Sequence, residues 1–536
     1  MSNEDEFDVV IIGSGAAGAA VAWRLSLYSN LKIACIEQGD FATSEKYPSA
    51  FADWENRATT EFSFQPKVRN NWADYDIDDA ESPIKISNFN GVGGSTVLFS
   101  GHYPRFHPSD FYVKDLDGVA DNWPITYKHL EPYYSINDSV VGVAGMSGDP
   151  AYPEIEGLLP PIPLGKMGER VASGFNKLDW HWWPSYAAIN TSSRNRRPVC
   201  INLGPCNSGC SQGAKSSADV TYWPLAINNG VRLITSTRVL GLDPSNSEQR
   251  VESLRYVNSN GQHGRIRAKS FVVACNGIGT PRLLLASKSK KFPLGLGNNN
   301  SLLGRNLMLH PLAYVEGVVS EDISSSIGPQ GCCLQSQQFY ETQSGHAFKR
   351  GFTMQILRSP GPLVTAQQGI KRKRINFGQN FHTQFNTHFN KTISISMITE
   401  DLPEVHNQVS LSPRLDKDGF PIPKIQYKLS SNTKEMLAFS ICKGKELLKA
   451  IGAIEILSYA PVSFSGWHLM GTARMGNDPE SSVTNRFGKV HELENLFIAD
   501  SSLFVTSGAV NPASTIQALA LYVADNIASD LGCVLK

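Results

Sequence analysis

The sequence predicts an α/β fold whose parallel sheet is built from both ends of the chain. Residues 7–12 ("FDVVII") form a short apolar run rich in β-branched residues, which is typical of a strand buried on both faces. Residues 16–28 then follow a helical pattern, and residues 31–39 contain a second strand. Residues 495–527 show a strand, a loop and a long apolar helix at the far end. We therefore expect one discontinuous domain with other material inserted in its middle.

A glycine-rich turn joins the first strand to the first helix. Gly13, Gly15 and Gly18 have the G-x-G-x-x-G spacing, and Glu37 stands at the end of the second strand. Glycines let the backbone approach a pyrophosphate at the helix N-terminus, and an acid after the second strand can accept hydrogen bonds from a ribose. Strand, turn, helix, second strand and acid occur in the order of a Rossmann-like unit. The pattern therefore predicts dinucleotide binding and leaves NAD and FAD both open.

The charge balance limits the partners that we expect. The chain has 536 residues with 49 basic and 49 acidic side chains, so its formal net charge is zero. Nucleic acids and anionic membranes select basic surfaces, which makes a small-molecule partner the better expectation. No apolar run approaches the roughly 20 residues that span a bilayer. The N-terminal "MSNEDEF" lacks the basic and apolar regions of a secretory signal, which predicts a cytoplasmic protein without a membrane span.

The cysteines do not predict a disulfide framework, because there are nine of them, an odd count, in a long chain. Cys200, Cys206 and Cys210 stand close together in the sequence, but no further cysteine or histidine follows at the short spacing of a zinc or iron–sulfur site. We therefore expect no metal. A local disulfide between Cys206 and Cys210 and two separate thiols both stay open.

Several further motifs occur in a fixed order along the chain. They are "GVGGSTVLFSG", "GAKSSADVTYWPLA", "NGIGTPRLLLAS", "LLGRNLMLHP", "HLMGTARMG" and "NPASTIQALALYVAD". Together with "GSGAAG" they resemble the glucose-methanol-choline (GMC) family of flavoprotein oxidoreductases, nearest its branch of sugar and sugar-acid enzymes. The resemblance implies an α+β arrangement overall. An FAD-binding domain would comprise residues 1–130, 205–319 and 461–536, and an inserted substrate-binding domain with an antiparallel sheet would comprise residues 131–204 and 320–460.

The resemblance also assigns residues to the cofactor. It implies FAD contacts from a second glycine-rich loop, from the end of the last strand and from the start of the last helix; these are Gly93, Gly94, Ser95, Thr96, Asp500, Ser501, Pro512, Ala513 and Thr515. Some relatives attach FAD covalently through a histidine in the second loop. Leu98 occupies that position here, so the resemblance implies FAD that is bound non-covalently.

A catalytic pair follows from the chemistry of alcohol oxidation by hydride transfer. The hydroxyl proton needs a base beside flavin N5, and histidine suits that task near neutral pH. The resemblance implies that His468, which heads "HLMGTARMG", is this base. Asn511 matches a histidine or asparagine of relatives, and its amide can hold the substrate oxygen and stabilise developing charge. For His310, in "MLHP", we expect packing or a backbone hydrogen bond.

These assignments predict an enzyme that oxidises an alcohol group to a carbonyl with FAD. The favoured substrate is a sugar, a glycoside or a polyol, and the electron acceptor is either oxygen or a quinone-like molecule. The substrate's identity, the oxidised carbon and the oligomeric state stay open. A lyase or another non-redox flavoenzyme on the same fold is the alternative, which the pair of His468 and Asn511 disfavours.

Overall fold

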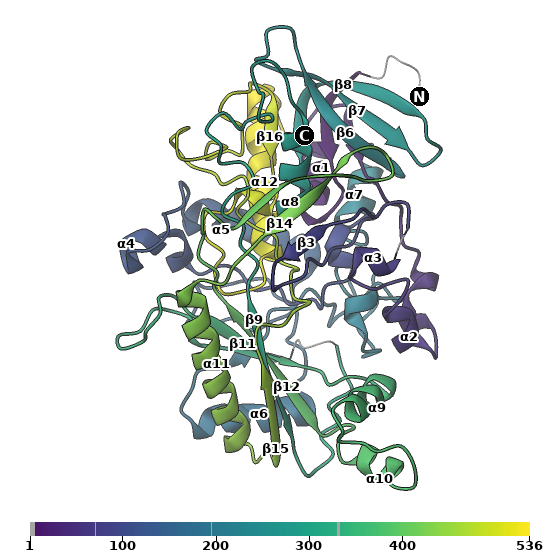
Figure 1. The fold of residues 1–536 in the computed structure, drawn as a ribbon, viewed down its shortest axis with the longest axis vertical. Helices are drawn as coiled ribbons and strands as arrows, with labels where there is room; N and C mark the ends of the chain where they lie inside the picture. Colours follow the sequence, from purple (N-terminus) through teal and green to yellow (C-terminus); the bar gives the residue numbers. More distant parts are fainter. Residues whose placement is uncertain (1–5, 70, 195, 330–332, 536) are drawn as a thin grey trace.

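Two large sheets lie toward opposite ends of the molecule's long axis (Figure 1). The computed structural model describes residues 6–69, 71–194, 196–329 and 333–535. The upper sheet in Figure 1 receives the purple N-terminal strand and a strand from the yellow C-terminal segment, and both pair with the same central strand although they come from opposite ends of the chain. The lower sheet is formed by the teal and green middle of the chain.

The upper sheet has the order β5-β2-β1-β8-β7-β6, and β16 also pairs with β8. β5, β2, β1, β8 and β16 run parallel to one another, whereas β6, β7 and β8 form an antiparallel meander. The strands are β1 (Glu6–Ile12), β2 (Ile33–Ile36), β5 (Arg232–Ile234), β6 (Thr237–Pro244), β7 (Val251–Asn258), β8 (His263–Val273) and β16 (Leu496–Ile498). Because β16 completes a sheet begun by β1, the prediction of a discontinuous α/β domain is confirmed.

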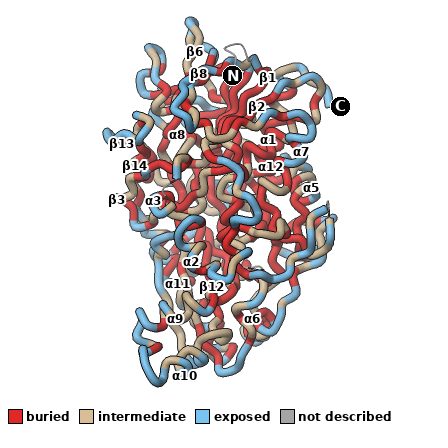
Figure 2. Tube along the Cα trace, turned by 90° about the vertical axis from the view of Figure 1, so that its right-hand side faces the viewer, coloured by how far each residue is buried: buried red, intermediate tan, exposed pale blue. Residues whose placement is uncertain are grey.

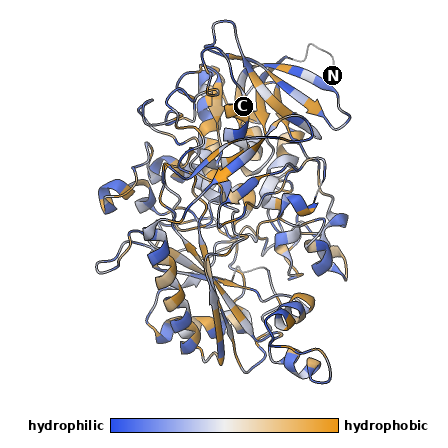
Figure 3. Ribbon diagram, viewed as in Figure 1, coloured by the Kyte–Doolittle hydropathy of each residue, from blue (hydrophilic) through white to orange (hydrophobic). Residues whose placement is uncertain are grey.

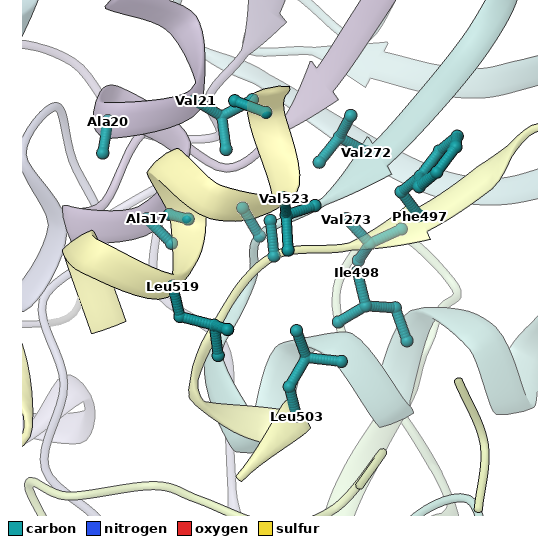
Figure 4. Close-up of a cluster of buried hydrophobic side chains, with 14 of the residues drawn as sticks. Ala17, Ala20, Val21, Val272, Val273, Phe497, Ile498, Leu503, Leu519 and Val523 are labelled. Carbon is teal, nitrogen blue, oxygen red and sulfur yellow. The ribbon is translucent and has the colours of Figure 1, made fainter. Parts of the chain in front are cut away.

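Two helices from the chain ends pack together against this sheet. Small side chains on α1 (Ala16–Ser26) let α12 (Ala513–Asp530) approach closely, and both helices are buried along most of their length. Figure 4 shows their shared core with the sheet, to which α1 contributes Ala17, Ala20 and Val21, α12 contributes Leu519 and Val523, and the strands contribute Val272, Val273, Phe497 and Ile498. This core anchors the start of α12 beside the turn after β1.

The lower sheet is antiparallel throughout and has the order β15-β9-β12-β11-β10-β4. Its strands are β4 (Trp183–Pro184), β9 (Leu312–Val318), β10 (Leu334–Phe339), β11 (Phe352–Leu357), β12 (Thr392–Thr399) and β15 (Glu455–Tyr459). The amphipathic helix α11 (Ser431–Ala450), with orange and blue residues in Figure 3, and α6 (Gly165–Lys177) cover one face with apolar side chains. The predicted insertion of an antiparallel sheet is confirmed.

A small third sheet joins an early segment to a late one. It consists of β3 (Asp78–Glu81), β13 (Gln408–Leu415) and β14 (Pro421–Gln426). The remaining helices are α2 (Trp54–Ala58), α3 (Pro66–Arg69), α4 (Val113–Asp117), α5 (Tyr127–Val141), α7 (Tyr222–Asn228), α8 (Asn276–Ala286), α9 (Pro362–Lys371) and α10 (Phe381–Asn386). Figure 2 shows buried chain through the middle of the molecule and exposed chain at α9 and α10. Within the described ranges, no helix combines the length and apolar character needed to cross a membrane.

The predicted division into two domains stays a prediction, and two elements cross its boundaries. β9 falls in the segment 205–319 assigned to FAD, yet it pairs with β12 of the lower sheet. α5 falls mostly in the segment 131–204 assigned to the substrate, yet it packs against α12. The positions of β9 and α5 depend on strand pairing and helix packing between segments that are distant in the sequence. No local sequence pattern predicts such contacts.

Candidate active site

A cavity of about 640 Å³ lies between the upper and lower sheets. The upper half supplies the turn after β1, the end of β2, the loop around Gly94 and the start of α12. The lower sheet supplies side chains from β9, β11 and β12, which form the roof of the cavity. Ten predicted cofactor residues line it, namely Gly13, Gly15, Glu37, Gly94, Ser95, Thr96, Asp500, Ser501, Pro512 and Ala513, and so do His468 and Asn511.

Glycines bring two backbone loops into contact at one end of the cavity. Gly13 has φ +97°, and a side chain on Gly18 would run into the carbonyl of Gly13. A Cβ on Gly94, whose φ is +55°, would lie 2.7 Å from Gly15 Cα. Gly15 is the N-cap of α1 and has no side chain to bond the first amides of the helix. Those amides can therefore bind an anionic group, so this cradle fits a pyrophosphate.

Glu37 lies at the end of β2, where a dinucleotide ribose would be bound in a Rossmann-like unit. Its Oε2 accepts hydrogen bonds from the Ser14 amide (2.9 Å) and the Ser14 hydroxyl (2.7 Å), and its Oε1 accepts from the Gly39 amide (2.8 Å). Burial raises the pKa of Glu37, and these hydrogen bonds oppose that shift. Carboxylate oxygens have about four acceptor sites in all, so Glu37 can still accept a bond from a ribose hydroxyl.

The second loop is held in place from inside the protein. Gly93 has φ +92°, and its amide donates to the Ser14 carbonyl (3.1 Å). The Thr96 hydroxyl donates to the Gly93 carbonyl (2.6 Å) and accepts from the Ala218 amide (2.9 Å). The buried Lys215 was not singled out from the sequence; its Nζ donates to the carbonyls of Val97 (2.7 Å), Phe99 (2.9 Å) and Cys206. Thr96 and Lys215 thus stabilise the loop shape itself.

The end of β16 is also fixed by internal hydrogen bonds. Asp500 Oδ2 accepts from the Asn276 amide (2.9 Å) and the Thr280 hydroxyl (2.6 Å), and Oδ1 accepts from the Ser502 amide (2.8 Å). The Ser501 hydroxyl donates to the Leu469 carbonyl (2.6 Å). Asp500 therefore links α8 to the segment that leads from β16 to Asn511, and it also lines the cavity.

The start of α12 opens onto the cavity through Pro512 and Ala513. Pro512 is the N-cap and makes no side-chain cap, which leaves the first amides of the helix available. Thr515 lies one turn further and does not line the cavity; its hydroxyl bonds Tyr134 Oη at 2.7 Å. Gly18 and Gly93 also lie outside the lining, where they permit close backbone contacts.

His468 and Asn511 meet at the centre of the cavity. Asn511 Nδ2 lies 3.5 Å from His468 Nε2, and Asn511 Oδ1 accepts a hydrogen bond of 2.5 Å from Gln355 Nε2 on β11. The roof therefore orients the Asn511 amide so that its NH₂ group faces His468. Gln355 is a positioning residue that no sequence motif identified.

His310 selects the tautomer of His468. His310 Nε2 faces two groups that can only accept, the carbonyls of Ser507 (3.1 Å) and Gly508 (2.7 Å), so this nitrogen carries the proton. Burial lowers the pKa of His310 to about 4, which leaves its Nδ1 as an acceptor at neutral pH. His468 Nδ1, at 2.9 Å, must then be the donor. His468 Nε2 consequently keeps its lone pair and faces Asn511.

The electrostatic surroundings keep His468 neutral. Burial lowers its pKa well below the ordinary value of 6.5, and His310 and His102 lower it further. A base for an alcohol must be unprotonated before the reaction, so this shift prepares His468 for proton abstraction. In the part of the chain that the structure describes, no three histidine, cysteine or acidic side chains are arranged to hold a metal. No disulfide joins Cys206 to Cys210 among the described residues.

Comparisons with known proteins identify the family. Two models described as GMC oxidoreductase match residues 187–312 and 403–520. The chain is 38% identical to 2-methyl-1,2-propanediol dehydrogenase of Mycolicibacterium austroafricanum, covering 98% of this chain and 96% of that protein. It is 31% identical to paromamine 6'-oxidase of Streptomyces fradiae, covering 98% and 92%. Pyridoxine 4-oxidase from Mesorbium loti has a similar fold, with a TM-score of 0.66, 17% identity, and coverage of 97% and 99%. The chain therefore belongs to the GMC oxidoreductase family, whose members oxidise alcohol groups with FAD.

Proposed function

We propose that this protein oxidises one hydroxyl of a small neutral polyol to a carbonyl, with His468 as the base. The observation that carries the proposal is the unprotonated His468 Nε2, which faces the cavity beside the Asn511 amide. His468 Nε2 can accept a proton and Asn511 Nδ2 can donate a hydrogen bond, and both face the same region of the cavity. That combination suits a hydroxyl group, which both donates and accepts.

The catalytic residues divide the work between a base and an orienting amide. The substrate O–H bond breaks as its proton moves to His468 Nε2, while the Asn511 NH₂ group stabilises the oxygen as it gains negative charge. The hydrogen of the adjacent C–H bond leaves with its electron pair, and the C=O double bond forms. FAD, when bound, supplies the acceptor for that hydride. After the reaction His468 is protonated and must release the proton before the next turnover.

The charge of the cavity supports a neutral substrate. The charged side chains among its described lining residues are Glu37, Arg238, Arg282 and Asp500, and all four belong to the upper sheet, its connections or α8. The roof end instead presents apolar, aromatic and uncharged polar side chains, including Tyr314, Leu357, Ser396, Phe464 and Trp467. A carboxylate or an ammonium group would be buried there without a partner, which is costly. A sugar or a polyol fits, and the relative named for a diol makes small diols the first class to test.

FAD would be bound non-covalently in this proposal. Leu98, at the position where some relatives carry the linking histidine, cannot form that bond. We expect acid precipitation to release all of the flavin into the supernatant, and flavin fluorescence that stays with the denatured protein on a gel would contradict this. Reoxidation of the reduced enzyme by oxygen, measured against reoxidation by a quinone, would identify the class of electron acceptor.

Anaerobic titration of the flavin-containing enzyme tests the function directly. Small diols, polyols, sugars and matched mono-alcohols are each mixed with the protein, and loss of the oxidised-flavin absorbance reports reduction. We expect reduction by members of the diol and polyol group. His468→Ala should retain flavin and reduce it about 10²- to 10⁴-fold more slowly, the usual contribution of a general base. The exposed His406→Ala serves as the matched control. Failure of every alcohol to bleach the flavin would reject the proposal and favour a non-redox activity such as a lyase.

A further inference from the structure

The roof sheet has two chemically different faces. On β12, Ile393, Ile395 and Met397 point into the apolar cluster under α11 and α6. The alternate residues on this strand include Ser394 and Ser396, and Ser396 lines the cavity. Successive side chains of a strand point to opposite faces, so the polar set shares the face directed at the catalytic pair. A buried polar face of this kind needs hydrogen-bond partners.

One row of this polar face crosses four strands. Backbone pairing places Tyr314 of β9 opposite Ser396, Ser396 opposite Gln355, and Gln355 opposite Gln335 of β10. Directly opposed residues have Cβ atoms about 5 Å apart, so each side chain can reach its neighbour. Tyr314, Ser396 and Gln355 line the cavity, and Gln335 lies behind Gln355 on the same face.

Gln335 is fully buried and unsatisfied. Neither its amide nitrogen nor its amide oxygen has a hydrogen-bond partner among the described residues. An unpaired buried polar group destabilises a protein, and an amide has two of them. The row therefore contains hydrogen-bonding capacity that the protein alone does not use.

His102, which lies outside the roof sheet, also has hydrogen-bonding groups without partners among the described residues. It lines the cavity, its exposed fraction is 2%, and neither ring nitrogen has a partner in the described part of the chain. Burial lowers its pKa to about 3, so the imidazole is neutral and offers one donor and one acceptor. His102 also lowers the pKa of His468, which places it near the base.

The backbone connects these two features. Trp183 of β4 pairs with Gln335, and four residues later Ala187 pairs with His102. One short extended segment therefore spans from the end of the polar row to the cavity histidine. Both features are uncharged and buried, and both are close to the catalytic pair, because Gln355, which stands opposite Gln335, bonds Asn511 and His102 acts on the pKa of His468.

We propose that His102 and Gln355, which both line the cavity, form a subsite for a second hydroxyl of the substrate, and that Gln335 supports the Gln355 amide from behind. The inference rests on the proposed function and adds that the enzyme recognises a second hydroxyl beside the one that is oxidised. While His468 and Asn511 hold the hydroxyl that is oxidised, the neutral imidazole of His102 and the Gln355 amide bind a neighbouring hydroxyl. A substrate that lacks this second hydroxyl leaves these buried groups unpaired, so it is selected against.

Two apolar replacements of similar size test the subsite, His102→Phe and Gln335→Leu. Each is made in the flavin-containing enzyme and compared with His346→Phe, a histidine that packs on Phe348 and Phe439 outside the cavity. Anaerobic stopped-flow reduction is measured with a vicinal diol and with the two mono-alcohols that each lack one of its hydroxyls. We expect His102→Phe to lower the apparent second-order rate constant for the diol about 10- to 100-fold, as loss of one or two hydrogen bonds implies, and to leave the mono-alcohols near their wild-type rates.

Thermal stability gives an independent readout. Because the replaced groups are unsatisfied in the ligand-free protein, both variants should keep or raise the melting temperature, whereas loss of a structural hydrogen bond would lower it. Equal losses for diol and mono-alcohols, or loss of flavin from His102→Phe, would assign His102 to catalysis or to the cofactor and overturn the subsite. An unchanged ratio of diol to mono-alcohol would overturn it as well. If wild-type flavin is reduced by no alcohol, the proposed function itself fails, and that result is distinct from the others.

Discussion

His310 offers the sharpest test of the catalytic geometry, because it touches the base without reaching the cavity. His310→Phe keeps an aromatic ring in the core but removes the acceptor for the His468 Nδ1–H group and the donor to the carbonyls of Ser507 and Gly508. A buried donor that loses its partner is destabilised by roughly 1–3 kcal/mol. His468 can then adopt the other tautomer, with its proton on Nε2, which cannot accept the substrate proton. At 1.36 kcal/mol per tenfold change, flavin reduction should slow about 5- to 150-fold.

The assay is anaerobic stopped-flow reduction of the enzyme flavin by a saturating diol, followed over a range of pH. His310→Gln provides the matched control, since an amide can accept from His468 and donate to the two carbonyls at once. We expect His310→Gln to recover a large part of the rate that His310→Phe loses. Wild-type reduction rates in His310→Phe, or equal losses in both variants at equal thermal stability, would refute the tautomer argument.

Three further outcomes follow from the same geometry. Since the pKa of His468 in the folded protein lies well below 6.5, His468 stays unprotonated as the pH falls through 6.5, and the rate of flavin reduction should decline only at more acidic pH. A pH profile of that rate with its midpoint at or above 6.5 would contradict this. Gly94→Ala brings a Cβ to 2.7 Å from a backbone Cα and should lose flavin on gel filtration, whereas Gly118→Ala, also at positive φ but with no described atom within 4 Å, should retain it. Arg350→Met leaves buried carboxylates without their cation and should reduce the free energy of unfolding in urea by roughly 3–5 kcal/mol, against at most about 1 kcal/mol for the exposed Arg250→Met.

The upper sheet could be predicted because its signals are local. The strand from Phe7, the glycine turn and Glu37 can each be recognised from a few consecutive residues. In the structure they form a Rossmann-like unit. The lower sheet could be predicted only as a region. Its strands pair across long sequence separations, and the position of β9 within it depends on its pairing with β12, which no local pattern records.

The candidate site was predictable to the extent that its residues stand in motifs. His468 and Asn511 do, and both line the cavity. His310 also stands in a motif, and the expected backbone hydrogen bond is present, but its contact with His468 Nδ1 requires three-dimensional placement. His102 and Gln335 have no such context. Their importance lies in missing partners and in strand register, which become visible only when every neighbour of a buried atom is known.

The contacts of the segment before α12 indicate where specificity can change without loss of catalysis. Tyr340 donates to the buried Asp110 at 2.7 Å and accepts from the Ala509 amide at 3.1 Å, and Gln355 holds the Asn511 amide from the roof. Gln355 both orients Asn511 and lines the cavity, so a substitution of Gln355 would alter catalysis and substrate binding together. His102 makes no hydrogen bond to this segment within the described residues. Substitutions at His102 should therefore change which alcohol is bound while leaving the base and its orienting amide in place.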